Sequence, residues 1–185
     1  CGVNGVILRS TNSGNSWTST INGSGDLFSV HSISSTYWIS GAGGFCLKST
    51  DSGLSWSQQQ TNTTSSLKSI YFIDNLTGWA AGTSRVIIKS TNGGANWILQ
   101  SSGTTNDLNC IRFSSSSTGF ACGKSGTLLR TTNGGANWSP LNPGTTRELF
   151  SVDLRNNTVM LSGEYSTALR STNLGASWSA IDYKQ

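Results

Sequence analysis

The chain has 185 residues and a formal net charge of +4, and only 11% of its residues are charged. About half are Ser, Thr, Asn or Gly, which excludes a protein of long charged helices, while seven Trp and two Pro exclude an intrinsically disordered chain. The basic residues form no run and no apolar stretch is long enough to span a bilayer, so we predict neither a nucleic-acid partner nor a membrane span.

A short motif recurs five times along the chain, at residues 9–17, 48–56, 89–97, 130–138 and 170–178. Each copy begins with Lys or Arg and ends with Trp, and consecutive copies lie 39 to 41 residues apart. The closing tryptophans are Trp17, Trp56, Trp97, Trp138 and Trp178. Self-similarity at this period indicates a repeat architecture.

Each full repeat holds four short apolar runs separated by Ser, Asn, Gly and Thr. The first runs are Leu27–Val30, Leu67–Ile70, Leu108–Ile111 and Leu149–Val152. About ten residues later each is followed by Trp38, Trp79, Phe120 or Met160. Such runs are typical of strands joined by tight turns, and four strands in about 40 residues are typical of one propeller blade. We predict an all-β fold, a β-propeller of about five four-stranded blades, with four complete repeats and one half blade.

We predict a single domain over residues 1–185, with repeats that end near the five closing tryptophans. The chain begins with Cys1 at the third strand of a repeat, around Val6, and ends seven residues after Trp178. Two strands of a fifth blade are therefore missing. The missing strands would come from flanking sequence within a larger propeller or from another chain, or the arc is open with paired edges. We favour the first alternative, in which the chain is a fragment of a longer protein.

The motif Ser/Thr-x-Asn/Asp-x-Gly-x-x-Trp resembles the Asp-box, or bacterial neuraminidase repeat. The fuller unit, residues 69–82 followed by 89–97, is similar to repeats of the photosystem II stability and assembly factor type. The resemblance covers essentially the whole chain and implies a bacterial protein that is extracellular, periplasmic or on the cell surface. Because the box occurs in hydrolases, lectins and assembly factors, it leaves the function open.

The resemblance implies structural roles for the box residues: the amide or carboxylate binds local backbone N–H groups, the glycine makes the turn, and the Trp packs into the blade. These turn residues are Asn12, Asp51, Asn92, Asn133 and Asn173. Asn stands in four boxes where Asp is usual, and it can make the same turn without charge. With one His and no dense carboxylate loop, we predict no metal site and no cofactor.

The four cysteines occupy repeat positions that elsewhere hold small or apolar residues, so we interpret them as core residues. Cys1 and Cys122 share one position, Cys110 takes a position otherwise filled by Ser, and Cys46 takes an apolar one. Of all pairs, only Cys110 and Cys122, on adjacent strands of one blade, could form a disulfide, and unpaired core cysteines are the interpretation we favour.

A basic residue recurs at one position in every repeat, and rotational symmetry would place these residues in a ring. They are Arg9, Lys48, Lys89, Arg130 and Arg170. Such a ring could attract a carboxylate, a sulfated or sialylated glycan, or an acidic protein tail. The alternative, which we favour, is that each residue caps its strand and lays its stem over the box Trp.

A second position, just before each first strand, holds Asp26, Ser66, Asp107 and Glu148. First strands line the central channel of a propeller, so these acids could surround its mouth. Paired carboxylates are what glycoside hydrolysis requires, which makes Asp26, Asp107 and Glu148 the candidates if the chain is an enzyme. Solvated acids at strand entrances are the simpler interpretation, and no sialidase cluster is recognisable.

We therefore expect a non-catalytic, secreted or surface β-propeller module that binds a protein or a glycan, with an anionic ligand suited to the basic ring. Two alternatives remain. The chain is a fragment of a glycoside hydrolase or sialidase-like enzyme, or it is a structural subunit that associates with itself through its incomplete blade.

Overall fold

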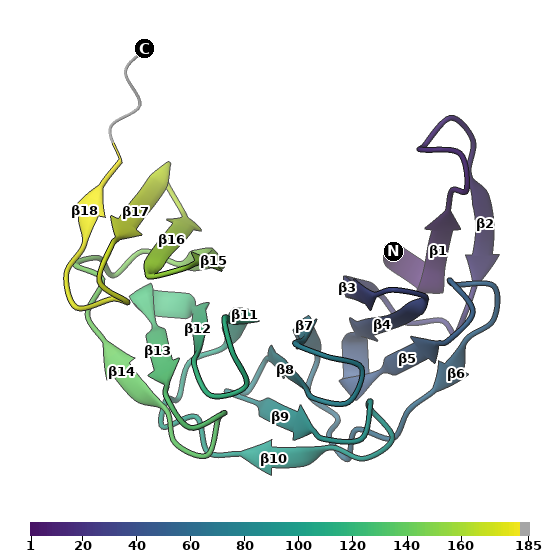
Figure 1. Ribbon diagram of the computed structural model, residues 1–185, viewed down its shortest axis with the longest axis horizontal. Coiled ribbons are helices and arrows are strands. Elements are labelled where there is room, and N and C mark those ends of the chain that lie inside the picture. The colour runs from purple at the N-terminus through teal and green to yellow at the C-terminus, as the bar shows by residue number, and fades with distance from the viewer. Residues whose placement is uncertain (182–185) are drawn as a thin grey trace.

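The computed structural model describes residues 1–181, and over this range the chain forms an open arc of antiparallel β-sheets (Figure 1). Four sheets have four strands and one has two, and in each four-stranded sheet the strands follow chain order. The prediction of an all-β propeller with four complete blades and a half blade is thus confirmed. The domain predicted from the sequence also includes residues 182–185, which lie outside the described part.

Blade 1 consists of β1 (Val6–Arg9) and β2 (Thr18–Ile21). Blade 2 consists of β3 (Leu27–Ile33), β4 (Thr36–Gly41), β5 (Cys46–Ser49) and β6 (Ser57–Gln58). Blade 3 consists of β7 (Leu67–Phe72), β8 (Gly78–Gly82), β9 (Ile87–Ser90) and β10 (Ile98–Gln100). Blade 4 consists of β11 (Leu108–Phe113), β12 (Gly119–Gly123), β13 (Leu128–Thr131) and β14 (Ser139–Leu141). Blade 5 consists of β15 (Leu149–Arg155), β16 (Thr158–Gly163), β17 (Thr167–Ser171) and β18 (Ser179–Ala180).

Three short 3-10 turns complete the fold. η1 (Val3–Gly5) precedes β1, whereas η2 (Ala42–Gly44) and η3 (Lys124–Gly126) each connect the second strand of a blade to the third. In the described part of the chain, these are the helical elements, and none is long and apolar enough to cross a membrane.

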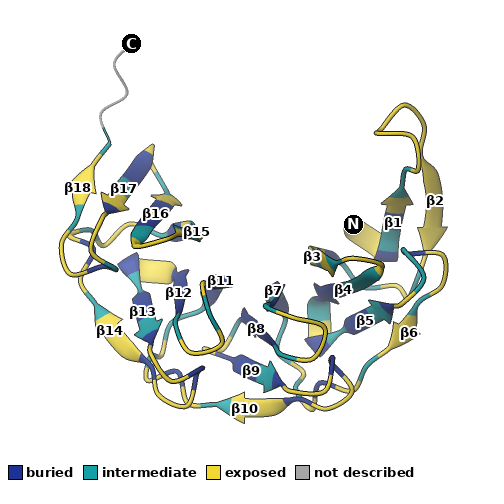
Figure 2. Ribbon diagram, viewed as in Figure 1, coloured by how far each residue is buried: buried dark blue, intermediate teal, exposed yellow. Residues whose placement is uncertain are grey.

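Burial falls from the inner strands to the outer strand of each blade (Figure 2). Every residue of β8 and of β12 is buried, because neighbouring blades cover both faces of these second strands. The fourth strands lie at the convex edge, where β2 and β6 are exposed throughout. The apolar core therefore lies between blades rather than in one central cluster.

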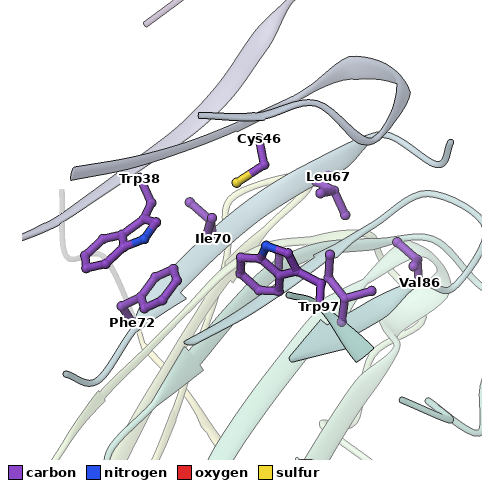
Figure 3. Packing of buried hydrophobic residues seen from close by; sticks show 9 residues of the cluster. Trp38, Cys46, Leu67, Ile70, Phe72, Val86 and Trp97 are labelled. Carbon is purple, nitrogen blue, oxygen red and sulfur yellow. The ribbon is translucent and has the colours of Figure 1, made fainter. Parts of the chain in front are cut away.

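Aromatic rings join neighbouring blades. Trp38 of β4 stacks on Phe72 of β7 with ring centroids 3.8 Å apart, and Phe72 meets Trp97 edge-on at 5.7 Å (Figure 3). One blade further on, Trp79 stacks on Phe113 at 3.5 Å. The indole Nε1 of Trp79 also donates a hydrogen bond to the carbonyl oxygen of Gly134, 3.0 Å away in the next box. Each second-strand tryptophan thus fixes its blade to the following one.

The first strands lie along the concave edge of the arc, where each has a sheet edge with no neighbouring strand from residues 1–181 (Figure 1). Serine hydroxyls from the preceding blade bind amides on this edge. The Oγ of Ser29 accepts the N–H of Ile70 at 3.3 Å, and the Oγ of Ser69 accepts the N–H of Ile111 at 3.2 Å. Polar backbone groups of the inner edge are thereby satisfied inside the protein.

We expect Trp79→Ala to lower the free energy of unfolding by about 3–5 kcal/mol, because it removes a fully buried ring and leaves a cavity between two blades. Chemical denaturation followed by circular dichroism measures the change. Trp17→Ala is the control: Trp17 is 60% exposed, so its loss should cost less than about 1 kcal/mol. Equal losses in the two variants would contradict this account of the core.

Candidate functional site

The box residues build the same hydrogen-bonded turn in all five repeats. In the second box, the hydroxyl of Ser49 donates to Oδ1 of Asp51 at 2.7 Å and accepts the N–H of Gly53 at 2.8 Å. The same Oδ1 accepts the N–H of Ser55 at 2.9 Å. Because the amide of Asn accepts in the same geometry in the other four boxes, the turn does not depend on charge.

The box glycine is required where the neighbouring blade comes close. Gly135 has a φ of +90°, and a Cβ there would lie 3.1 Å from Nε1 of Trp79. The closing tryptophans differ in exposure along the arc: Trp97 and Trp138 are buried, whereas Trp17 in the two-stranded blade is exposed.

The basic residues of the box lie over aromatic rings of their own blades. Lys48 Nζ is 5.9 Å from the ring centre of Trp38, and Lys89 Nζ is 5.3 Å from that of Trp79. The ring beneath each lysine is thus that of the second-strand tryptophan, whereas we expected the ring of the Trp that closes the box. The reason is cross-strand register, since Trp38 pairs with Lys48 on the adjacent strand.

The remaining basic residues follow the same arrangement in part. The guanidinium carbon of Arg130 is 5.9 Å from the ring centre of Phe120, and Nε of Arg9 donates to the carbonyl oxygen of Ser52 at 2.7 Å. Arg170 of blade 5 is exposed. A ligand-binding role for the five basic residues stays a prediction.

The acids before the first strands connect each blade to the one before it. Asp26 Oδ1 accepts the N–H of Asn4 at 3.1 Å, and Asp107 Oδ1 accepts the N–H of Ser84 at 2.8 Å. Glu148 Oε1 accepts an N–H from the side chain of Asn109 at 2.8 Å. These three acids, our candidates for an enzyme, therefore each have a partner in the preceding blade.

Asp107 also forms an ion pair, with Lys124 Nζ 2.9 Å from Oδ2. The hydrogen bond from Lys124 lowers the pKa of Asp107, and the N–H of Ser84 lowers it further. A carboxyl group that acts as a general acid needs a raised pKa, so Asp107 is poorly suited to that role. Catalysis by these acids remains untested.

The structure brings together a set of residues that the sequence analysis did not select. His31, Tyr71, Arg112 and Asp153 come from the first strands of four consecutive blades, and we call them the concave row. The rings of His31 and Tyr71 lie 4.6 Å apart, and the guanidinium carbon of Arg112 lies 5.6 Å from the centre of the Tyr71 ring. Because the first strands line the concave edge, the concave row runs along that edge (Figure 1).

The surroundings of the concave row shift the pKa of two of its members, His31 and Tyr71. Burial lowers the pKa of His31 most, a hydrogen bond to the backbone of Phe72 partly offsets this, and the positive charge of Arg112 lowers the pKa further, so the neutral imidazole is favoured. Burial raises the pKa of Tyr71, which keeps its phenol protonated. Arg112 Nη1 donates to the carbonyl oxygen of Ile111 at 2.9 Å and to Ser69 Oγ at 3.3 Å. These bonds orient the guanidinium and use only part of its five N–H groups.

A chain of polar side chains accompanies the concave row. Lys68 Nζ donates to Oδ1 of Asn109 at 2.8 Å, and Nδ2 of Asn109 donates to Oε1 of Glu148 at 2.8 Å. We call these three residues the polar relay. It crosses blades 3, 4 and 5, so the concave edge carries a cation, an amide and a carboxylate in hydrogen-bonded order.

One signal in the sequence could have identified the concave row. Its members stand four residues after the Leu that opens each first strand, and this position changes from His to Tyr, Arg and Asp while its neighbours repeat. A position whose residue type varies within a regular repeat is not required for the packing or the turns of the blade. The sequence analysis considered mainly positions that recur.

Among residues 1–181, no three His, Cys, Asp or Glu side chains are grouped so that they could hold a metal ion. All four cysteines are free, although Cys110 and Cys122 face each other in the register of β11 and β12. Burial raises the pKa of Cys46 to about 12 and also raises that of Cys122, so both thiols are protonated at neutral pH.

The sequence profile described as "Photosynthesis system II assembly factor YCF48" matches the chain twice, over residues 53–139 and 96–185. Together the two matches span more than half of the chain. The chain belongs to the YCF48 family. No functionally curated protein is similar enough in sequence to match it.

Solved structures with the same fold include two YCF48 proteins. "YCF48 bound to D1 peptide" is 18% identical with a TM-score of 0.68, and the match covers 97% of this chain and 75% of that one. YCF48 from Cyanidioschyzon merolae is 18% identical with a TM-score of 0.70, covering 87% of this chain and 57% of that one.

A glycoside hydrolase also has this fold. The GH74 enzyme of Niastella koreensis is 20% identical with a TM-score of 0.78, covering 95% of this chain but only 34% of the enzyme. At these identities the three structures are evidence for the fold alone.

Asp51 should make the stability of this YCF48-family chain depend on acid. Hydrogen bonds from the hydroxyl and the N–H of Ser55, and then from the hydroxyl of Ser49, hold the pKa of Asp51 well below its ordinary value of 3.8. Because the folded-state pKa is depressed, the stabilisation is present above the unfolded-state pKa and is lost as the pH falls below it.

The measurement is the free energy of unfolding of the wild type minus that of Asp51→Asn, from urea denaturation at several pH values. We expect this difference to be constant near neutral pH and to decrease as the pH falls below about 3.8. Asn173→Asp is the matched reverse variant, because its box also offers two serine hydroxyls, and it should acquire the same acid dependence. A difference that does not change with pH would contradict the role of these bonds.

Proposed function

We propose that this chain is a non-catalytic β-propeller module that binds an extended segment of another protein along its concave edge. The concave row, with the polar relay beside it, carries this proposal. It offers an aromatic ring, a guanidinium with spare N–H groups and an ammonium from Lys68 on adjacent blades. Tyr and Arg are among the residue types that contribute most to protein interfaces, and Arg binds carboxylates in two-point geometry.

The relatives favour a protein ligand over a glycan. One YCF48 structure with this fold contains a D1 peptide, so a propeller of this family can bind a polypeptide segment. The family is also described as an assembly factor, a role that requires contact with other proteins. Glycan binding and a location outside the cytoplasm rest on the repeat resemblance alone, and we retain them as weaker proposals.

A glycosidase is the competing function, because GH74 enzymes share the fold. Asp107 is engaged by Lys124 and has a lowered pKa, which argues against its use as a proton donor. We expect no hydrolysis of a panel of fluorogenic glycosides and xyloglucan oligosaccharides. Turnover that disappears in Asp107→Asn or Glu148→Gln would favour the enzyme instead.

Peptides selected from a random displayed library test the binding proposal. We expect Tyr71→Ala and Arg112→Gln each to weaken the selected peptides about tenfold or more, measured by fluorescence anisotropy, because they remove central contacts. Tyr165→Ala and Arg85→Gln are matched controls, since both residues are exposed and lie in turns outside the first strands, and they should change affinity less than about twofold.

Thermal melts of each variant separate lost binding from lost folding. If Arg130→Gln and Arg170→Gln weaken binding while the concave-row variants do not, the basic ring is the site and the concave row is not. If no variant changes affinity, the proposal fails.

A further inference from the structure

Blade 4 places two cysteines opposite each other on its inner strands. Cys110 of β11 pairs with Cys122 of β12 in the antiparallel register, and both side chains are buried. The cross-strand pairs at the same positions of the other four-stranded blades are Ser29–Ser40, Ser69–Ala81 and Ser151–Ser162. Blade 4 therefore departs from the repeat at both members of one pair, and it puts a thiol at each.

Both thiols lie on the side of blade 4 that faces blade 5. Sγ of Cys110 donates to the carbonyl oxygen of Val152 at 3.7 Å, and Sγ of Cys122 donates to that of Leu149 at 3.9 Å. Val152 and Leu149 both belong to β15. Directly opposed residues of an antiparallel pair have their side chains on the same face, and the two cysteines share one apolar cluster. The thiols are thus neighbours in space as well as in register.

The hydrogen bonds of β11 define the kind of cross-strand pair. The N–H of Ile111 points away from β12, because it is bound by Oγ of Ser69 in the preceding blade. Successive residues of a strand direct their backbone groups to opposite sides, so those of Cys110 point toward β12. Cys110 and Cys122 are therefore a hydrogen-bonded pair, whose Cα atoms lie about 5.5 Å apart. This spacing falls within the range that disulfides span.

The spacing of the Cβ atoms is less favourable for a disulfide. In directly opposed residues it is about 4.5–5.5 Å, whereas a disulfide joins Cβ atoms about 3.5–4.5 Å apart. The register of β11 shifts between Leu108 and Cys110, and such an irregularity lets the strand adjust locally. A disulfide between Cys110 and Cys122 would thus carry some strain, which makes it easier to reduce than a structural disulfide.

We propose that Cys110 and Cys122 form a reversible disulfide by exchange with a disulfide oxidant such as oxidised glutathione. Cys110 reacts first, because it lies on the strand at the concave edge and is 4% exposed, whereas Cys122 is 0% exposed. Local opening of that edge gives the oxidant access.

The exchange takes two steps. The thiolate of Cys110 attacks one sulfur of oxidised glutathione, whose S–S bond breaks, and one glutathione leaves as its thiolate. The thiolate of Cys122 then attacks the sulfur of Cys110 and displaces the second glutathione. Each cysteine gives up one proton and each released glutathione takes one up, so two cysteines are oxidised and one glutathione disulfide is reduced.

The disulfide would alter the junction between blades 4 and 5. Sulfur atoms joined in a disulfide carry no proton, so the hydrogen bonds to the carbonyl groups of Val152 and Leu149 would be lost. The side chain of Asn109 would still hold the carbonyl oxygen of Leu149. Because β15 also carries Asp153, the redox state of the pair would act on one end of the concave row.

The test uses the full chain with Cys1→Ser and Cys46→Ala, so that only the proposed pair remains. Ser162 and Ala168 hold these two positions in blade 5, so both substitutions suit the repeat. One sample starts reduced. The other is oxidised in urea and refolded. Both are equilibrated in glutathione buffers of different ratio and digested with trypsin. Arg112 lies between the cysteines, so residues 90–112 and 113–124 stay joined only through the disulfide.

We expect both samples to reach the same fraction of joined peptides at each glutathione ratio, and this fraction to rise as the buffer becomes more oxidising. Three results would overturn the proposal. They are no joined peptides at any ratio, a disulfide that reduced glutathione does not open, or an oxidised chain that fails to regain the near-ultraviolet circular dichroism of the reduced one.

Hydrogen exchange measured by mass spectrometry tests the effect on the blade junction. In the oxidised chain β15 should exchange faster than in the reduced chain, while β3 of blade 2 should not change. The matched control adds Cys110→Ser and Cys122→Ser, which recreates the serine pair of blades 2 and 5, and its exchange should not depend on glutathione. Unchanged exchange of β15 on oxidation would refute the coupling of the pair to blade 5.

Discussion

The structure depends on mutual coverage of the blade faces. The second strands β8 and β12 are buried on both sides, and the residues that bury them come from neighbouring blades. A single blade of this kind cannot bury its own apolar residues, so stability arises mainly at the junctions between blades. The stacked pairs Trp38–Phe72 and Trp79–Phe113 are two of these junction contacts. They also fix the angle between blades, and with it the curvature of the concave edge.

Hydrogen bonds between neutral side chains and the backbone stabilise most of the turns in this fold. The hydroxyl of Ser or Thr and the side-chain oxygen of Asn or Asp turn the chain in every box, and only Asp51 brings a charge to this turn. This accounts for a composition rich in Ser, Thr and Asn and poor in charged residues. It also explains why the charges that are present, such as Arg112, Lys68 and Asp107, occupy positions between blades.

Much of the fold could be predicted from the sequence because each blade repeats the same physical problem. The Trp at the end of each box and the Leu at the start of each first strand recur since every copy needs the same turn and the same buried face. The half blade could be predicted too, because the sequence before the second repeat contains only two of the four strand-like runs. What lies beneath each lysine could not be predicted, because cross-strand register, not spacing along the chain, brings Trp38 under Lys48.

The candidate site was harder to predict for the opposite reason. His31 and Tyr71 are 40 positions apart in the sequence and meet only because adjacent blades bring their first strands together. A position that differs in each repeat carries no periodic signal. The acids before the first strands illustrate a related difficulty. The sequence shows that Asp26 and Asp107 occupy a recurring position. It does not show that they bind Asn4 and Ser84, because these partners belong to the preceding blade.

The serine hydroxyls on the concave edge have a consequence for solubility. Ser29 and Ser69 occupy backbone amides of β7 and β11 that would otherwise be open to a foreign strand. Cys110 holds the same repeat position in blade 4, and its thiol instead donates to the carbonyl oxygen of Val152. Hydroxyl groups therefore shield amides of β7 and β11 from pairing with a foreign strand, whereas the thiol of Cys110 binds a carbonyl group of β15 instead.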